Sequence, residues 1–131
     1  MNSVDTINLP DYIWWEDETD WTPVEQSVEY STTGALLVDL AVKLAGQPLT
    51  LVGDESTAWV TREAVLGLQA FAAVPGKEMT VAIHGRSFQA MFRHDGGKPV
   101  DAEPVVRITP PADDDWYVLK ALRFLILSEN L

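Results

Sequence analysis

The chain has 131 residues, of which 47% are hydrophobic, and its formal net charge is −11. This length accommodates one domain with a sizeable core. The chain contains no cysteine, which excludes disulfide bonds and thiolate metal sites. Tight nucleic-acid binding requires clustered lysine and arginine, and only nine such residues are scattered along this chain.

The opening residues MNSVDTINLP lack the basic and apolar regions of a secretion signal. The longest apolar run lies near the C-terminus, is broken by Lys120 and Arg123, and is too short to cross a bilayer. We therefore expect a soluble protein that is made in the cytoplasm and has no contact with a membrane.

Residues 1–23 combine two prolines, six acidic side chains and three tryptophans without clear periodicity. We interpret them as an extended N-terminal arm, followed by a single β-barrel-like domain over residues 24–131. Tryptophan presents a large apolar area at low entropic cost, so Trp14, Trp15 and Trp21 are candidate anchors on a partner. The alternative is that they fold back onto their own domain.

Residues 24–30 alternate between apolar and polar side chains with the period of a half-solvated strand, and the following STTG predicts a turn. Residues 36–44 fit a strand face and a helix face equally well. Their low β-branched content favours a helix, whereas the tight turn after them favours a hairpin, and we prefer the strand. A short strand is expected over residues 49–52, after Pro48.

The segment from Ala58 to Ala73 predicts the one clear helix, over about residues 61–73. Thr61 is the expected N-cap, and Val60 and Val65 occupy the positions of a hydrophobic staple. The apolar side chains that follow recur at helical spacing and form a stripe that can cover a sheet.

A hairpin is predicted from Met79 to Arg93, with His84 and Gly85 as its turn and apolar side chains of both strands facing the core. Residues 94–104 read as a flexible loop and residues 103–109 as a further strand. Residues 116–127 alternate like a long final strand, although a helix remains open there. The predicted fold is mainly β, a split β-barrel or sandwich of antiparallel strands with one flanking helix.

No group of residues predicts a reaction. Neither His84 nor His94 has a nearby cysteine or a zinc-binding sequence motif around it. The three consecutive aspartates at 113–115 diverge, whereas a calcium loop spaces its ligands so that they converge. We therefore expect no enzyme activity, no cofactor, no metal and no small-molecule substrate.

The unit from Gly34 to Asp95 resembles the small tail-tip proteins of long-tailed bacteriophages, in particular distal tail and tail hub proteins. The likeness covers roughly half of the chain. It consists of a hairpin that ends in a strand of the pattern G-x-P-[IL]-T-L-x-G, then one helix, and then a second hairpin. The matching residues are Gly46, Pro48, Leu49, Thr50, Leu51, Gly53, Thr80, Val81, His84, Gly85, Arg86, Phe88, Phe92 and Arg93.

The resemblance implies a tail-tube-like split β-barrel that assembles with itself into a ring between the tail tube and the baseplate. DNA would pass through the ring without specific binding, and the acidity of the chain agrees with this role. Because the sequence shows no carbohydrate-binding or other C-terminal domain like that of fuller distal tail proteins, we expect a structural adaptor in the virion. Expected interface residues are Trp14, Trp15, Trp21, His84, Arg86 and Arg93.

A second hypothesis comes from another class of protein. A small acidic cytoplasmic module can mimic nucleic acid and inhibit a basic host protein, and a net charge of −11 suits that role as well. The two hypotheses differ in the partners that they predict: other virion proteins for the first, and one basic host protein for the second.

Overall fold

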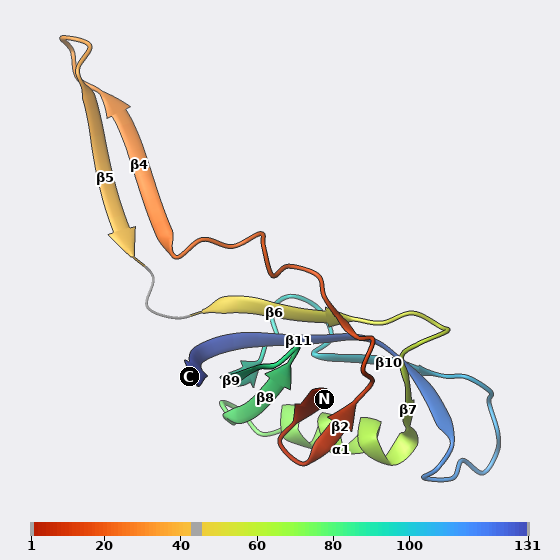
Figure 1. The fold of residues 1–131 in the computed structure, drawn as a ribbon. Helices are drawn as coiled ribbons and strands as arrows, with labels where there is room; N and C mark the ends of the chain where they lie inside the picture. The colour runs from red at the N-terminus through yellow and green to blue at the C-terminus, as the bar shows by residue number, and fades with distance from the viewer. Residues whose placement is uncertain (1, 43–45, 131) are drawn as a thin grey trace.

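A computed structural model describes residues 2–42 and 46–130 of the chain. Strands account for 48% and helix for 9%, which confirms the predicted mainly β class. A curled antiparallel sheet forms a half-barrel beside one helix, and a separate two-stranded hairpin projects away from this body (Figure 1).

The elements follow one another in an order in which one helix interrupts a series of strands. They are β1 Asn2–Val4, β2 Ile7–Leu9, β3 Trp14–Trp15, β4 Val24–Tyr30, β5 Leu36–Val42, β6 Gln47–Val52, β7 Trp59–Thr61, α1 Arg62–Ala72, β8 Met79–Ile83, β9 Arg86–Phe92, β10 Val100–Pro104 and β11 Trp116–Asn130.

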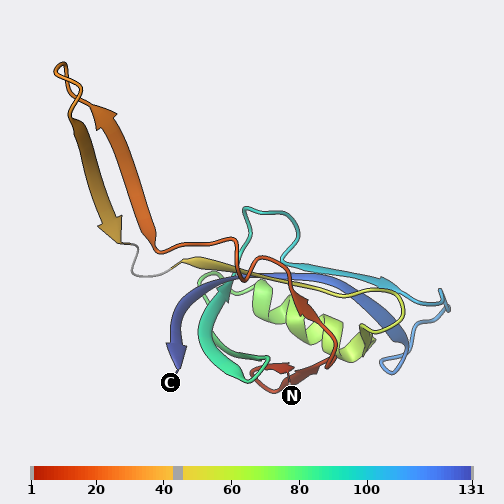
Figure 2. The same ribbon diagram turned by 45° about the horizontal axis from the view of Figure 1, so that its top comes forward.

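The body is organised around the long strand β11, which pairs with four other strands. Its first part pairs with β7 and β10, and its later part pairs with β6 and β9. Register shifts interrupt the ladders with β10 and with β9, and such irregularities increase local twist. The sheet curls accordingly around the helix (Figure 2).

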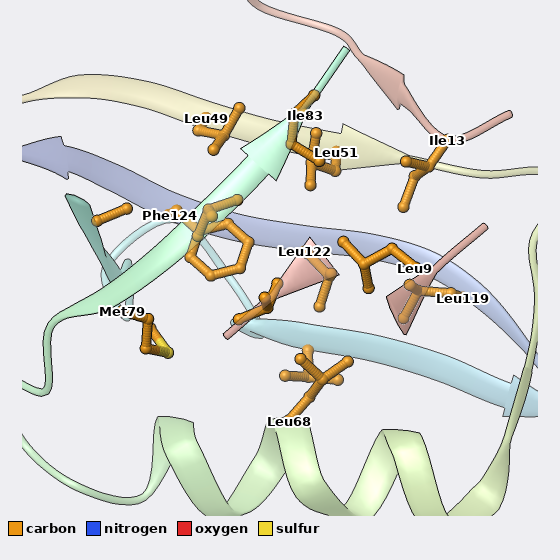
Figure 3. Close-up of a cluster of buried hydrophobic side chains, with 14 of the residues drawn as sticks. Leu9, Ile13, Leu49, Leu51, Leu68, Met79, Ile83, Leu119, Leu122 and Phe124 are labelled. Carbon is orange, nitrogen blue, oxygen red and sulfur yellow. The ribbon is translucent and has the colours of Figure 1, made fainter. Parts of the chain in front are cut away.

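The core lies between the concave side of the sheet and α1. Leu68 of the helix points towards Leu119 and Leu122 of β11, while Leu49 and Leu51 lie along β6 (Figure 3). Close by, the rings of Phe92 and Phe124 stack with their centroids 4.6 Å apart. Alternate residues of β11 from 122 to 126 are buried, as the sequence pattern predicts.

The helix begins where its sequence predicts. Thr61 has extended backbone angles, and its hydroxyl oxygen accepts a hydrogen bond from the Ala64 N–H, which makes Thr61 the N-cap. Val60 and Val65, the expected staple residues, are both buried. Within the described residues, no helix is long and apolar enough to cross a membrane.

The predicted hairpin is confirmed as β8 and β9. His84 and Gly85 form its turn with φ angles of 49° and 81°, as a two-residue hairpin turn with two positive φ angles requires. The expected core residues Val81, Ile83, Phe88, Ala90 and Phe92 are all buried. The preferred strand interpretations of residues 36–44 and 116–127 also hold, as β5 and β11, except that residues 43 and 44 lie outside the described residues.

The structure differs from the prediction in the first 23 residues. Residues 2–15 are not an extended arm, because they form three strands that pair with β8 and β6 and bury four apolar side chains. The projecting element is instead the hairpin of β4 and β5, which had been assigned to the barrel-like domain.

The strand predicted over residues 103–109 is wrong in position. The structure forms β10 over Val100–Pro104, within the segment predicted as a flexible loop, and residues 105–109 are irregular. Val100 is buried against β11, whereas Val106 and Ile108 are exposed. Pairing with β11 therefore decides the position of the strand, and this partner is not visible in the local sequence.

Candidate assembly surface

The hairpin of β4 and β5 is the most unusual feature of the molecule. Its strands pair with each other over seven positions, from Val24 opposite Val42 to Tyr30 opposite Leu36. They form a two-stranded sheet of their own, joined to no strand of the body within the described residues. Both views show it standing clear of the half-barrel (Figures 1 and 2).

The tip of the hairpin is a well-bonded turn. Ser31 N–H donates to the Ala35 carbonyl at 2.7 Å, and Gly34 N–H donates to the Ser31 carbonyl at 2.9 Å. The Ser31 hydroxyl accepts from Ala35 N–H at 3.0 Å. Gly34 has a φ of 83°, a conformation that glycine adopts without steric cost. The turn thus fixes the register of the two strands.

One face of the hairpin is apolar and exposed. Because β-strand side chains alternate and paired residues share a face, the residues described on this face are Val24, Gln26, Val28, Tyr30, Leu36, Val38 and Leu40. We call this set the hairpin face. Its side chains remain accessible, with exposures of 73% for Tyr30 and 67% for Leu40. It contains no aspartate, glutamate, lysine, arginine or histidine, so a partner that covers it buries none of these charged side chains.

Asp17 ties the chain to the edge of the body ahead of residues 18–23, which lead to β4. The carboxylate accepts hydrogen bonds from the Thr50 N–H and hydroxyl and from the Trp15 indole N–H, each at 2.9 Å. Glu16 N–H also donates to the Thr50 carbonyl at 2.9 Å. These bonds hold residues 15–17 beside β6, and residues 18–23 then lead from this point to β4.

Three of the six predicted interface residues, Trp14, Trp15 and His84, gather near the β8–β9 turn. Trp14 is 65% exposed, with its ring centroid 6.0 Å from that of His84. The His84 ring is hydrogen-bonded within the body, with its Nε2 2.9 Å from the Ile13 carbonyl oxygen. Trp15 is 2% exposed and packs edge-on against Phe88, so it is a core residue.

The remaining predicted interface residues have local roles. Arg86 lies over the Trp15 ring and pairs with Glu18 at 3.3 Å and with Glu129 at 2.6 Å. Arg93 pairs with Asp95 at 2.9 Å, at the far end of β9. Trp21 lies on the segment that leads to β4, is half-buried and has an interaction partner. The six residues therefore do not form one continuous surface.

Sequence reasoning missed the hairpin face as a candidate site. The alternation of residues 24–30 predicts a strand and the strand is preferred for residues 36–44, but both segments are assigned to the barrel-like domain of residues 24–131. A signal was present: two segments of equal length, joined by a tight turn, are flanked by Pro23 on one side and by Gly46 and Pro48 on the other. Such boundaries are typical of an autonomous hairpin.

The described residues contain no group of three or more histidine, aspartate or glutamate side chains arranged to hold a metal ion. The carboxyl groups whose pKa is lowered are exposed and form hydrogen bonds with neighbouring side chains. Hydrogen bonds from the Ser56 side chain and backbone and from Thr57 lower the pKa of Asp54, and Lys120 lowers the pKa of Glu103 by hydrogen bonding and charge. Comparisons with protein-family models, curated proteins and solved structures gave no match.

Proposed function

We propose that this chain is a structural virion protein of a phage tail tip, a distal tail or hub adaptor whose copies form a ring between the tail tube and the baseplate. The observation that carries the proposal is the projecting hairpin with its exposed, uncharged face. The sequence resemblance to tail-tip proteins supplies the biological setting.

Physical chemistry supports assembly through the hairpin. An isolated two-stranded hairpin is marginally stable in water, and a contiguous exposed apolar surface marks an interaction site. The hairpin face combines both features, because it is exposed and its two strands pair only with each other among the described residues. Cover by another folded subunit would therefore stabilise the hairpin as well as bury its apolar face.

The body and the charge agree with this role. Within the ring, the half-barrel gives each copy a stable unit, and the net charge of −11 keeps passing DNA from adhering to the protein. Partners are other copies of the chain and the neighbouring tube and baseplate proteins, whereas no specific DNA contact is required.

The proposal is tested with a triple variant, Val28→Thr, Val38→Thr and Leu40→Gln. Threonine keeps the shape and strand propensity of valine, so the hairpin is retained while its face becomes polar. We expect the unmodified chain to form closed rings in native mass spectrometry and negative-stain images. The variant should remain monomeric at the same concentration with an unchanged melting temperature.

A matched control replaces exposed apolar residues of the body, with Leu66→Gln and Val74→Thr at α1 and the turn that follows it. These side chains are about as exposed as the hairpin residues, and we expect the control to assemble normally. Rings formed by the triple variant would contradict the proposal, as would an unmodified chain that stays monomeric.

A pull-down separates the tail role from the acidic-inhibitor alternative. From infected cells, a tail-tip protein should recover other virion proteins, and the triple hairpin variant should recover less of them. A stoichiometric complex with one basic host protein, unaffected by the hairpin substitutions, would overturn the tail proposal.

A further inference from the structure

A second exposed apolar surface lies on the body, where β7, the start of β11 and the chain after β10 meet. Its side chains line a groove that we call the tryptophan groove, formed by Trp59, Val105, Val106, Ile108 and Trp116. The two tryptophan rings are tilted by 45° with their centroids 6.1 Å apart, and they are 44% and 50% exposed. Asp114 and Asp115 also line the groove.

The tryptophan groove is held in shape by hydrogen bonds of its surroundings. The Trp59 indole N–H donates to the Glu55 carbonyl at 2.6 Å. Val105 N–H donates to the Trp116 carbonyl at 3.0 Å, which ties the chain after β10 to β11. Arg62 N–H donates to the Asp115 carbonyl at 2.8 Å. The surface is therefore preformed, as binding grooves usually are.

The hairpin and the tryptophan groove lie at opposite ends of the molecule. In both views β7, the end of β10 and the start of β11 lie at the end of the body away from β4 and β5 (Figures 1 and 2). The hairpin of a copy therefore cannot reach its own groove, but it can reach the groove of a second copy.

We propose that the hairpin face of one copy packs into the tryptophan groove of the next copy, so that the ring forms head to tail. This inference rests on the proposed function and specifies its interface. Each copy uses both of its exposed apolar surfaces, one as the inserted element and one as the receiving element. Such heterologous contacts generate rings when the rotation between copies closes.

The chemistry of the two surfaces is complementary. The apolar members of the hairpin face match the valines, isoleucine and tryptophans of the groove. The polar members of the hairpin face, Gln26 and Tyr30, can donate hydrogen bonds, and the carboxylates of Asp114 and Asp115 accept them. Packing two hairpin faces against each other would instead leave the tryptophan groove of both copies exposed.

The test places charge in the groove without altering a strand, using the double variant Val106→Glu and Ile108→Glu. Both residues lie in the irregular segment after β10 and are exposed. We expect the association of this variant to fall by about a hundredfold or more, because the charges would be buried against an apolar face. A matched control, Leu66→Glu with Val74→Glu, adds the same charge elsewhere and should assemble normally.

Cross-linking then tests which surfaces meet. The chain has no cysteine, so a Leu40→Cys variant can be mixed with an Ile108→Cys variant and treated with a short bis-maleimide. We expect a covalent dimer containing one copy of each variant, and no comparable product when Val74→Cys replaces Ile108→Cys. Equal yields in the two mixtures, or no dimer in either, would overturn the head-to-tail interface.

The failure of this inference is distinguishable from the failure of the proposed function. If the triple hairpin variant is monomeric while the groove variant assembles like the unmodified chain, the hairpin binds elsewhere and only the docking inference is wrong. If the triple hairpin variant also forms rings, the proposed function is wrong as well.

Discussion

The body and the hairpin are built from the same kind of sequence but differ in what covers them. In β9 the alternate residues Phe88, Ala90 and Phe92 are buried in the core. In β4, Val28 and Tyr30 alternate in the same way, yet they are exposed because no element of the described chain packs on their face. Alternation thus predicts a strand with one apolar face, and a separate observation must show what that face contacts.

This difference implies that the two regions have different energetic roles. Side chains in the body stabilise the monomer, since their removal leaves cavities in a packed core. Side chains of the hairpin face are exposed and contribute little to the packing of the monomer, and we propose that they act in contact with another copy. Substitutions in the two regions should therefore separate stability from assembly.

The largest effect is expected for truncation of Phe124, which is fully buried and stacked on Phe92. Phe124→Ala should lower the free energy of unfolding by about 3–5 kcal/mol. Tyr30→Ala also truncates an aromatic side chain, but it should change the free energy of unfolding of the monomer by less than about 0.5 kcal/mol. Urea denaturation at low protein concentration measures both values, and equal losses would refute the distinction.

The next largest loss of stability is expected when a methyl group is added to the body at Gly53. A Cβ at this position would lie 2.6 Å from the Leu119 carbonyl oxygen and closer still to Ala58, so backbone must move. Gly53→Ala should cost about 1–3 kcal/mol in thermal or urea unfolding. The control is Gly67→Ala, whose Cβ would meet only the flexible end of Ile7. A Gly53→Ala protein as stable as the Gly67→Ala protein would contradict this account of packing.

A comparable or smaller effect is expected at the junction of the two regions. Asp17→Ala removes the acceptor of three hydrogen bonds, including that of the Thr50 N–H, and should cost about 1–2 kcal/mol of unfolding free energy. It should also increase the amide exchange of residues 16–23. Asp20→Ala, on the same segment, is the control. Unchanged exchange in the Asp17 variant would show that Asp17 does not tie this segment to the body.

The smallest effect is a pH dependence of stability that arises from Asp54, in the turn before β7. Hydrogen bonds from Ser56 and Thr57 lower the pKa of Asp54 from its ordinary value of 3.8. A lowered pKa means that ionised Asp54 stabilises the folded state above about pH 4 and that this contribution is lost as the pH falls through the folded pKa. Asp54→Ala should therefore lower the melting temperature at pH 7, with a difference that shrinks at acidic pH. A difference independent of pH would argue against the ionised carboxylate.

Local features of the fold could be predicted from the sequence because local residues determine them. The N-cap at Thr61 and the turn at His84 and Gly85 depend on a few adjacent side chains and on backbone preferences. The strand periodicities of residues 24–30 and 79–92 were equally readable. These elements sit in the structure where the sequence places them.

Features that depend on distant partners could not be predicted. The three strands of residues 2–15 depend on β8 and β6, which follow much later in the chain. Trp15 looked like a surface anchor among acidic residues, but Phe88 covers its ring and Asp17 accepts from its indole. The hairpin face was missed for the same reason, since periodicity does not tell whether the covering surface belongs to the same chain.

The central claim is that the hairpin face is covered by another copy, and amide hydrogen exchange at two protein concentrations tests it most directly. In dilute monomer, residues 24–42 should exchange quickly while β9 and β11 exchange slowly. At concentrations where rings form, residues 24–42 should become protected, with little change in the body outside the tryptophan groove. A hairpin that is equally protected in both samples, or unprotected in the assembled one, would contradict the account.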